Sequence, residues 1–172
     1  MKTVSIKKLT FTALLTALIF IATTFIRIPL PFGYVNAGDA FIFLAVFTLG
    51  PAYGAVASGL GSALADLYGY PVYTPGTLVI KTLMALVAFV VYKLIFKATK
   101  KAVLAEIIAG IAGTLIMAFG YFIYEILFFT TAGVAIVNAP WNLLQGAVGT
   151  ALSVVVMRIL NKTSLLEKLQ KP

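Results

Sequence analysis

The amino-acid sequence predicts an all-α polytopic membrane protein: a bundle of six transmembrane helices with both termini in the cytoplasm. The first observation is composition, since 62% of the 172 residues are hydrophobic and only 10% are charged, against about 45–50% and about 25% in soluble domains. The second is that the sequence divides into six apolar stretches, and a chain of this length has room for about six spans of roughly 20 apolar residues each. The third is the distribution of Lys and Arg. We therefore expect one integral-membrane domain over residues 1–172, without an accompanying soluble domain.

The first predicted span begins after a basic N-terminus and ends near Arg27, where Pro29 and Pro31 stop a helix. Its apolar run is too long for the core of a signal peptide and no cleavage site follows, so we expect a retained span. An extended loop should then run from Pro29 to Asn36. The six spans are expected, in order, at about residues 9–28, 37–49, 52–67, 77–96, 103–130 and 141–160.

The second span is short for a full crossing, and Gly50-Pro51 predicts a tight turn before the third. Small residues recur in the third span at spacings of three and four, which puts them on one helical face. Such a face lets neighbouring backbones approach closely, and ordinary helix packing is the favoured explanation. These residues are Gly54, Ala57, Ser58, Gly61, Ser62 and Ala65.

The remaining spans are separated by loops at 68–76 and 131–140 and by a basic turn at 93–101. The fifth span is long enough to tilt or to project beyond the bilayer. A charged tail follows the sixth. We find no convincing internal repeat.

The basic residues predict the orientation of the bundle. Eleven of the thirteen lie on the side that six spans would give to both termini, and only Arg27 and Lys81 lie on the other. The positive-inside rule places that side in the cytoplasm. This asymmetry explains the net charge of +8 without a nucleic-acid partner. The eleven are Lys2, Lys7, Lys8, Lys93, Lys97, Lys100, Lys101, Arg158, Lys162, Lys168 and Lys171.

Several classes of chemistry are excluded by missing residues. The chain has no Cys and no His, which excludes disulfides, thiol nucleophiles, Cys or His metal sites and His-based triads. It contains no GxxxxGK[ST] motif, so it hydrolyses no nucleotide itself. No series of acidic residues crosses the bilayer as a proton relay. We therefore expect no catalytic residue, no metal and no cofactor.

Polar side chains of the spans gather in the external half of the predicted bundle. Apolar and aromatic walls with a few placed polar groups are typical of small-molecule pockets, so we predict a binding cup open to the outside. Tyr and Trp side chains there are suited to stacking on a heteroaromatic ring. The candidate substrate-binding residues are Asn36, Asp39, Asp66, Tyr73, Lys81, Tyr121, Glu125, Asn142 and Gln145.

Each of these candidates also has a purely structural interpretation. Tyr and Trp anchor helices at membrane interfaces, and Asp39 and Asp66 are placed to cap helix ends. Lys81 can extend to the outer surface or form an ion pair with Asp39, Asp66 or Glu125. Glu106, on the basic side, is expected at the interface. In the first span, Ala13 and Ala17 are small residues four apart, which suits either a partner helix or internal packing.

The chain resembles the S components of energy-coupling factor (ECF) transporters, the vitamin-binding membrane subunits of bacteria and archaea. The matching stretches are ALLTA, VNAGDAFIFLAVFTLGPAYGAVASGLGSALADL, TPGTLVIK and NAPWNLLQGAVG, spread over most of the sequence. The resemblance is to the branch associated with hydroxymethylpyrimidine and pyridoxine more than to the riboflavin, biotin or thiamine branches.

This resemblance implies a six-helix bundle in the prokaryotic cytoplasmic membrane with an external vitamin site. It implies association with a transmembrane coupling protein and two cytoplasmic ATPases, with Ala13 and Ala17 contacting the coupling protein. It also implies that the whole subunit topples in the membrane during transport. The leading hypothesis is therefore a vitamin-binding subunit for hydroxymethylpyrimidine, pyridoxine or another vitamin such as riboflavin or pantothenate. Two competing hypotheses are a stand-alone small transporter and an intramembrane acid–base enzyme using Asp39, Asp66 or Glu125.

Overall fold

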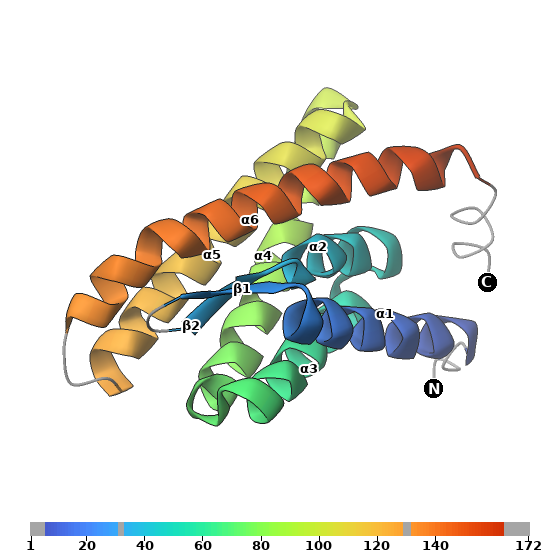
Figure 1. Cartoon of the computed structure of the whole chain (residues 1–172). Coiled ribbons are helices and arrows are strands. Elements are labelled where there is room, and N and C mark those ends of the chain that lie inside the picture. The colour runs from blue at the N-terminus through green and yellow to red at the C-terminus, as the bar shows by residue number, and fades with distance from the viewer. Residues whose placement is uncertain (1–5, 31–32, 129–131, 164–172) are drawn as a thin grey trace.

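The computed structural model describes residues 6–30, 33–128 and 132–163, and these form six α-helices, a β-hairpin and one 3₁₀ turn (Figure 1). Four helical segments are long and apolar enough to cross a membrane, at 6–25, 71–99, 102–128 and 132–161. The expected bundle of six helices is confirmed, with four helical segments long enough to span. The elements are α1 Ile6–Phe25, β1 Arg27–Leu30, β2 Gly33–Asn36, α2 Gly38–Leu49, α3 Pro51–Gly69, η1 Pro71–Tyr73, α4 Thr74–Thr99, α5 Ala102–Phe128 and α6 Ala132–Asn161.

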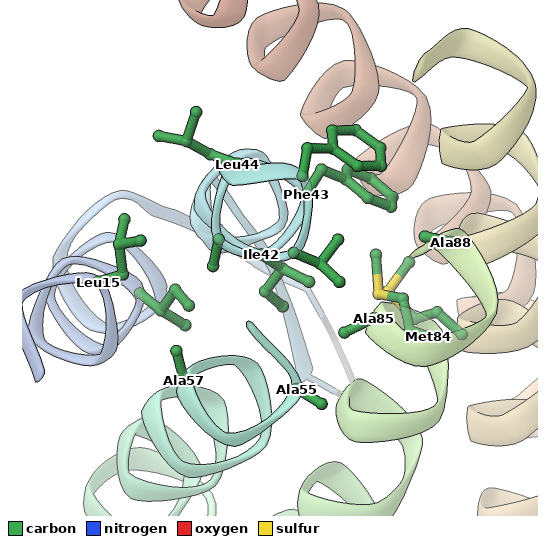
Figure 2. Packing of buried hydrophobic residues seen from close by; sticks show 14 of the residues in the cluster. Leu15, Ile42, Phe43, Leu44, Ala55, Ala57, Met84, Ala85 and Ala88 are labelled. Carbon is green, nitrogen blue, oxygen red and sulfur yellow. The ribbon is translucent and has the colours of Figure 1, made fainter. Parts of the chain in front are cut away.

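Helix α2 forms the centre of the bundle. It has 12 residues, which at 1.5 Å per residue span about 18 Å, too short to cross a hydrocarbon core of about 30 Å. It packs against α1, α3, α4 and α6. Its side chains point to these neighbours in different directions, with Ile42, Phe43 and Leu44 visible in Figure 2. This central position explains why the helix is apolar on every side, with Asp39 and Thr48 as its polar side chains.

The small residues of α3 allow close contact with helices on two sides. A Cβ added to Gly54 would lie 2.5 Å from the Cα of Val46 in α2. One added to Gly61 would lie 2.7 Å from the carbonyl oxygen of Thr16 in α1. All six small residues predicted to share this face are buried. Helix packing therefore accounts for the pattern.

Helices α4, α5 and α6 form the other side of the molecule, with α5 packed on both α4 and α6. The α5–α6 contact is reciprocal: Gly110 of α5 lies under the side chain of Thr150, and Gly146 of α6 lies under that of Thr114. Near the start of α4, Gly76 accommodates the ring of Tyr124. These close approaches hold the long helices side by side (Figure 1).

Several predicted boundaries and loops were wrong. An extended loop was expected from Pro29 to Asn36, after a first span that ends at residue 28. Residues 27–30 and 33–36 instead form two antiparallel strands, in which Arg27 pairs with Asn36 and Leu30 with Gly33. The predicted all-α class therefore omits this hairpin. Most of 68–76 is ordered as the end of α3, a 3₁₀ turn and the start of α4.

The other errors concern helix ends. Residues 132–140 of the predicted loop belong to α6, which begins at Ala132 and contains Pro140. A proline is tolerated inside membrane helices because neighbouring groups can satisfy the freed carbonyl. The basic turn is shorter than expected, since α4 continues to Thr99 and ends at Lys100 in the left-handed conformation (φ 58°). Other span limits agree to within about three residues. Some predictions fall outside the described residues: Lys2, Pro31, the end of the fifth span at 129–130, Thr131, Lys168 and Lys171.

Candidate functional site

A recess lies where the hairpin meets the end of α3, the start of α4 and the adjoining parts of α5 and α6. Its cavity volume is about 60 Å³, room for about five water molecules. Its wall contains apolar, aromatic and polar groups, as small-molecule sites do. The lining residues are Thr23, Leu30, Gly33, Tyr34, Asn36, Ser62, Asp66, Tyr73, Thr77, Lys81, Tyr121, Glu125, Asn138, Trp141, Asn142 and Gln145.

A buried ion pair lies at the deep end of this recess. Lys81 is seven residues from the first residue of α4, about 10 Å along the helix, and its Nζ donates to Asp39 Oδ1 of α2. Gln145 Nε2 of α6 donates to the other carboxylate oxygen of Asp39 at 2.9 Å. Both oxygens are therefore satisfied, as a buried carboxylate requires. Lys81 Nζ also lies 5.8 Å from the centre of the Tyr121 ring.

The hairpin is attached to this network through Asn36. The Gln145 side-chain oxygen accepts from the backbone N–H of Asn36 at 2.8 Å and from its Nδ2 at 3.1 Å. The Asn36 side-chain oxygen in turn accepts from the N–H of Gly38, at the start of α2, at 2.8 Å. One glutamine therefore links the hairpin, α2 and α6.

Asp66 forms a second attachment point on the other wall. It accepts hydrogen bonds from the hydroxyls of Tyr34 in β2 and Thr77 in α4. Thr77 Oγ1 also lies 2.8 Å from the Tyr121 hydroxyl of α5. Burial and the neighbouring Asp66 carboxylate raise the pKa of Tyr34, so this phenol stays protonated and remains a donor. The Arg27 guanidinium lies over the Tyr34 ring, 5.2 Å from its centre.

Glu125 forms the third polar centre, where α5 faces η1 and α6. Its Oε1 accepts from the Tyr73 hydroxyl at 3.1 Å and from Asn138 Nδ2 at 2.8 Å. The Tyr73 ring contacts those of Tyr121 and Tyr124, with centres 6.3 and 6.0 Å apart. This wall of the recess therefore combines aromatic surface with one carboxylate.

The structure brings eight of the nine predicted substrate-binding residues to the wall of the recess. The ninth, Asp39, lies behind the wall and holds Lys81 and Gln145. The prediction omitted Ser62, Thr77, Asn138 and other lining residues. Helical spacing is the signal that finds them, because residues four apart share a face: Ser62 with Asp66, Thr77 with Lys81, and Asn138 with Asn142.

The structure also decides between several alternatives left open by the sequence. Lys81 is 4% exposed and paired with Asp39, so it does not extend to the surface. Asp39 does not cap α2, because both of its oxygens bind side chains. Glu106 is 1% exposed and accepts a hydrogen bond from Arg158 of α6. Its position at the membrane interface stays a prediction.

Ala13 and Ala17 lie on an exposed face of α1, together with Leu14 and Ile21. The buried face of the same helix carries Leu15 and Ile19 instead. Internal packing among the described residues therefore does not explain the spacing of the two alanines. Their contact with a partner helix stays a prediction.

The arrangement is suited to binding. Within the described part of the chain, no group of three or more His, Cys, Asp or Glu side chains is placed to hold a metal ion. The recess offers hydrogen-bond donors and acceptors and aromatic faces to a small molecule.

Comparison with known proteins identifies related chains. A family model described as "ECF-type riboflavin transporter, S component" matches residues 3–167. A Pyrococcus woesei protein described as "Uncharacterized protein in gap 3'region" is 49% identical over 63 residues, which make up 36% of this chain and 43% of that protein. The matched stretch thus spans less than half of that relative.

Two solved structures have a similar fold. One, described as the S component of a bacterial ECF transporter, has a TM-score of 0.67 and 24% identity and covers 91% of this chain and 96% of its own. The other, described as an S component for biotin, has a TM-score of 0.70 and 21% identity and covers 92% of each chain. At these identities the similarity establishes the fold and leaves the ligand open.

Proposed function

The chain belongs to the family of ECF-type riboflavin transporter S components, and from that membership we propose that it binds riboflavin in the recess beneath the hairpin. As an S component it is a substrate-binding, multi-pass subunit of the cell membrane and not an enzyme. The observation that carries the ligand assignment is the family match over residues 3–167. The tyrosine-lined wall around Tyr73 and Tyr121 supports it, because a flavin presents a flat ring for stacking.

Hydroxymethylpyrimidine or pyridoxine is the second candidate, as expected from the sequence resemblance. The observation that favours it is the small cavity of about 60 Å³, which suits a single ring better than a three-ring flavin. The family match supports riboflavin over these smaller ligands. Riboflavin then requires the recess to widen on binding.

The proposed site residues are the eight lining residues predicted from the sequence, with Asp39 supporting Lys81 from behind. Lys81, Asn142 and Gln145 offer donors, while Glu125 offers an acceptor. The recess is proposed to open to the outside, with both termini in the cytoplasm, since most basic residues lie at the other end of the bundle. Helix α1 begins and α6 ends on the same side of the molecule (Figure 1), in keeping with this orientation.

ATP-driven uptake is proposed to depend on a transmembrane coupling protein and two cytoplasmic ATPases. The exposed Ala13 and Ala17 on α1 are the proposed contact with the coupling protein, because small residues let helices approach closely. A stand-alone transporter remains the competing hypothesis. Uptake in a host without the ATPases distinguishes the two.

Native mass spectrometry of detergent-purified protein from cells grown in rich medium tests the proposed ligand. We expect a co-purified mass equal to that of riboflavin, and titration of stripped protein with riboflavin should quench flavin fluorescence. A retained hydroxymethylpyrimidine or pyridoxine would replace riboflavin as the ligand. Purified protein that retains none of these vitamins, but moves riboflavin into liposomes without ATPases, would overturn the proposal.

A further inference from the structure

The wall of the recess contains a carboxylate of which only one oxygen accepts hydrogen bonds from the described residues. Glu125 is 2% exposed, and its Oε1 takes both hydrogen bonds that hold the side chain, from Tyr73 and Asn138. Within the described residues, its Oε2 is buried without a hydrogen-bond partner. A buried carboxylate oxygen in this state loses its hydration without replacement, which is costly. A bound group that donates to Oε2 removes this cost.

The other carboxylates near the recess have no such vacancy. Asp39 accepts from Lys81 and Gln145, one on each oxygen. Asp66 likewise accepts from Tyr34 and Thr77, one on each oxygen. A donor on the ligand therefore finds its unoccupied charged acceptor at Glu125.

A second unpartnered group faces the same recess from α3. Ser62 is 1% exposed, and its hydroxyl oxygen has no partner among the described residues. Helix α4 packs against both α3 and α5, so the two groups line the recess from either side of α4. A ligand that reaches both satisfies the two together.

The charges around the recess leave it acidic. The carboxylates are those of Asp39, Asp66 and Glu125, whereas the cations are Lys81, already paired with Asp39, and Arg27, over the ring of Tyr34. Among the described residues that line the recess, the one cation is Lys81, and its charge is already compensated by Asp39. A phosphate held here meets uncompensated negative charge in a medium of low dielectric, where repulsion is strong.

We propose that Glu125 is a specificity-determining residue: its free oxygen accepts a hydrogen bond from an N–H or O–H of the vitamin, and its charge excludes the phosphorylated form. Ser62 supplies a neutral second contact. The inference rests on the proposed function, because it concerns the ligand of the same recess. It goes further by restricting that ligand to unphosphorylated, donor-bearing vitamins.

Glu125→Gln is the informative variant. The amide keeps an oxygen for Tyr73 and Asn138 but replaces the free acceptor with a donor and removes the charge. Dissociation constants are measured by titration for two matched pairs: riboflavin with riboflavin 5′-phosphate, and pyridoxine with pyridoxine 5′-phosphate. Glu106→Gln provides the control, since it neutralises another buried glutamate of α5 away from the recess. Thermal melting checks that each variant is folded.

The wild-type protein is expected to prefer one unphosphorylated vitamin over its phosphate at least about tenfold. Glu125→Gln should weaken the unphosphorylated ligand about tenfold and reduce the preference to less than about threefold, while Glu106→Gln changes neither. Glu125→Asp, which keeps the charge, should retain the preference, and Ser62→Ala should weaken both members of the pair equally. These two variants also test the inference if Glu125→Gln does not fold.

Two results would overturn this inference alone: a wild-type protein that binds both members of the pair equally well, or a Glu125→Gln variant that weakens both by the same factor. The second result would indicate a structural role. If the wild-type protein binds neither riboflavin nor pyridoxine, the proposed function fails, and this inference fails with it.

Discussion

The described part of the chain contains two ion pairs, one at each end of the helical bundle, and they differ in burial and in surroundings. Lys81–Asp39 is at most 4% exposed, and its carboxylate is completed by Gln145. Glu106–Arg158 joins α5 to α6; its glutamate is 1% exposed and its arginine 36%. Here Glu106 Oε2 and Arg158 Nε have no hydrogen-bond partner in the described structure.

The difference shows that a buried charge in a membrane helix does not by itself mark a binding site. Intramembrane charges are generally read as functional, and both pairs satisfy that rule equally. Only Lys81–Asp39 borders a cavity and belongs to a network that reaches the hairpin through Gln145 and Asn36. We therefore assign ligand binding to the Lys81 end and helix-to-helix stabilisation to the Glu106 end.

Lys81→Met is expected to give the largest effect on vitamin affinity. The change leaves Asp39 buried without its cation, which costs roughly 3–5 kcal/mol, and it removes a donor from the recess. We expect affinity to fall by about 100-fold or more, together with a lower melting temperature, measured by fluorescence titration and thermal unfolding. The double variant Lys81→Met/Asp39→Asn should recover stability without recovering binding. Near-normal affinity in Lys81→Met would refute the assignment.

Gln145→Leu should have the second largest effect. Leucine removes the donor to Asp39 and the acceptor used by Asn36, so the hairpin loses these hydrogen bonds to α6. Losing such buried hydrogen bonds costs about 1–3 kcal/mol, and we expect about a tenfold loss of affinity in the same titration. Leu144→Ala, an exposed neighbour on α6, is the control. Equal losses in the two variants would mean that α6 is simply sensitive to substitution.

Arg158→Met should affect stability while sparing binding. Glu106 would lose its partner, but the arginine is partly exposed, so the expected cost is about 1–2 kcal/mol. The melting temperature should fall while vitamin affinity stays within about twofold of the wild-type value. A large loss of affinity would show that the two ends of the bundle are energetically coupled, and the assignment of ligand binding to the Lys81 end alone would be wrong.

Ala17→Trp should have the smallest effect on the isolated protein. The residue is exposed on α1, so a large side chain has room, and neither melting temperature nor affinity should change. Co-purification with the coupling protein should be lost if this face is the contact. The buried Ala57→Trp is the converse control, because overpacking should lower stability directly. Normal complex formation by Ala17→Trp would exclude this face.

Much of the fold could be predicted because membrane helices leave strong local signals. Apolar length, prolines and the asymmetry of the lysines indicate six helices and a common side for both termini. Local signals were weaker at the ends of elements. Each strand of the hairpin, at 27–30 and 33–36, has only four residues. Pro140 suggested the start of a helix, but α6 continues through it. Both cases depend on neighbours that compensate for a weak or unfavourable local sequence.

The sequence by itself determined the class of protein, the approximate spans and the residue types from which a site could be made. Only the tertiary structure decided which of these residues meet. Lys81 had three possible acidic partners in the sequence, and the packing of α2 against α4 selected Asp39. Similarly, the spacing of Ala13 and Ala17 was compatible with an inward or an outward face, and the packing of α1 against α2 and α3 turned them outward. The physical reason is that helix formation depends on contacts a few residues apart, whereas partner choice depends on packing between residues tens of positions apart.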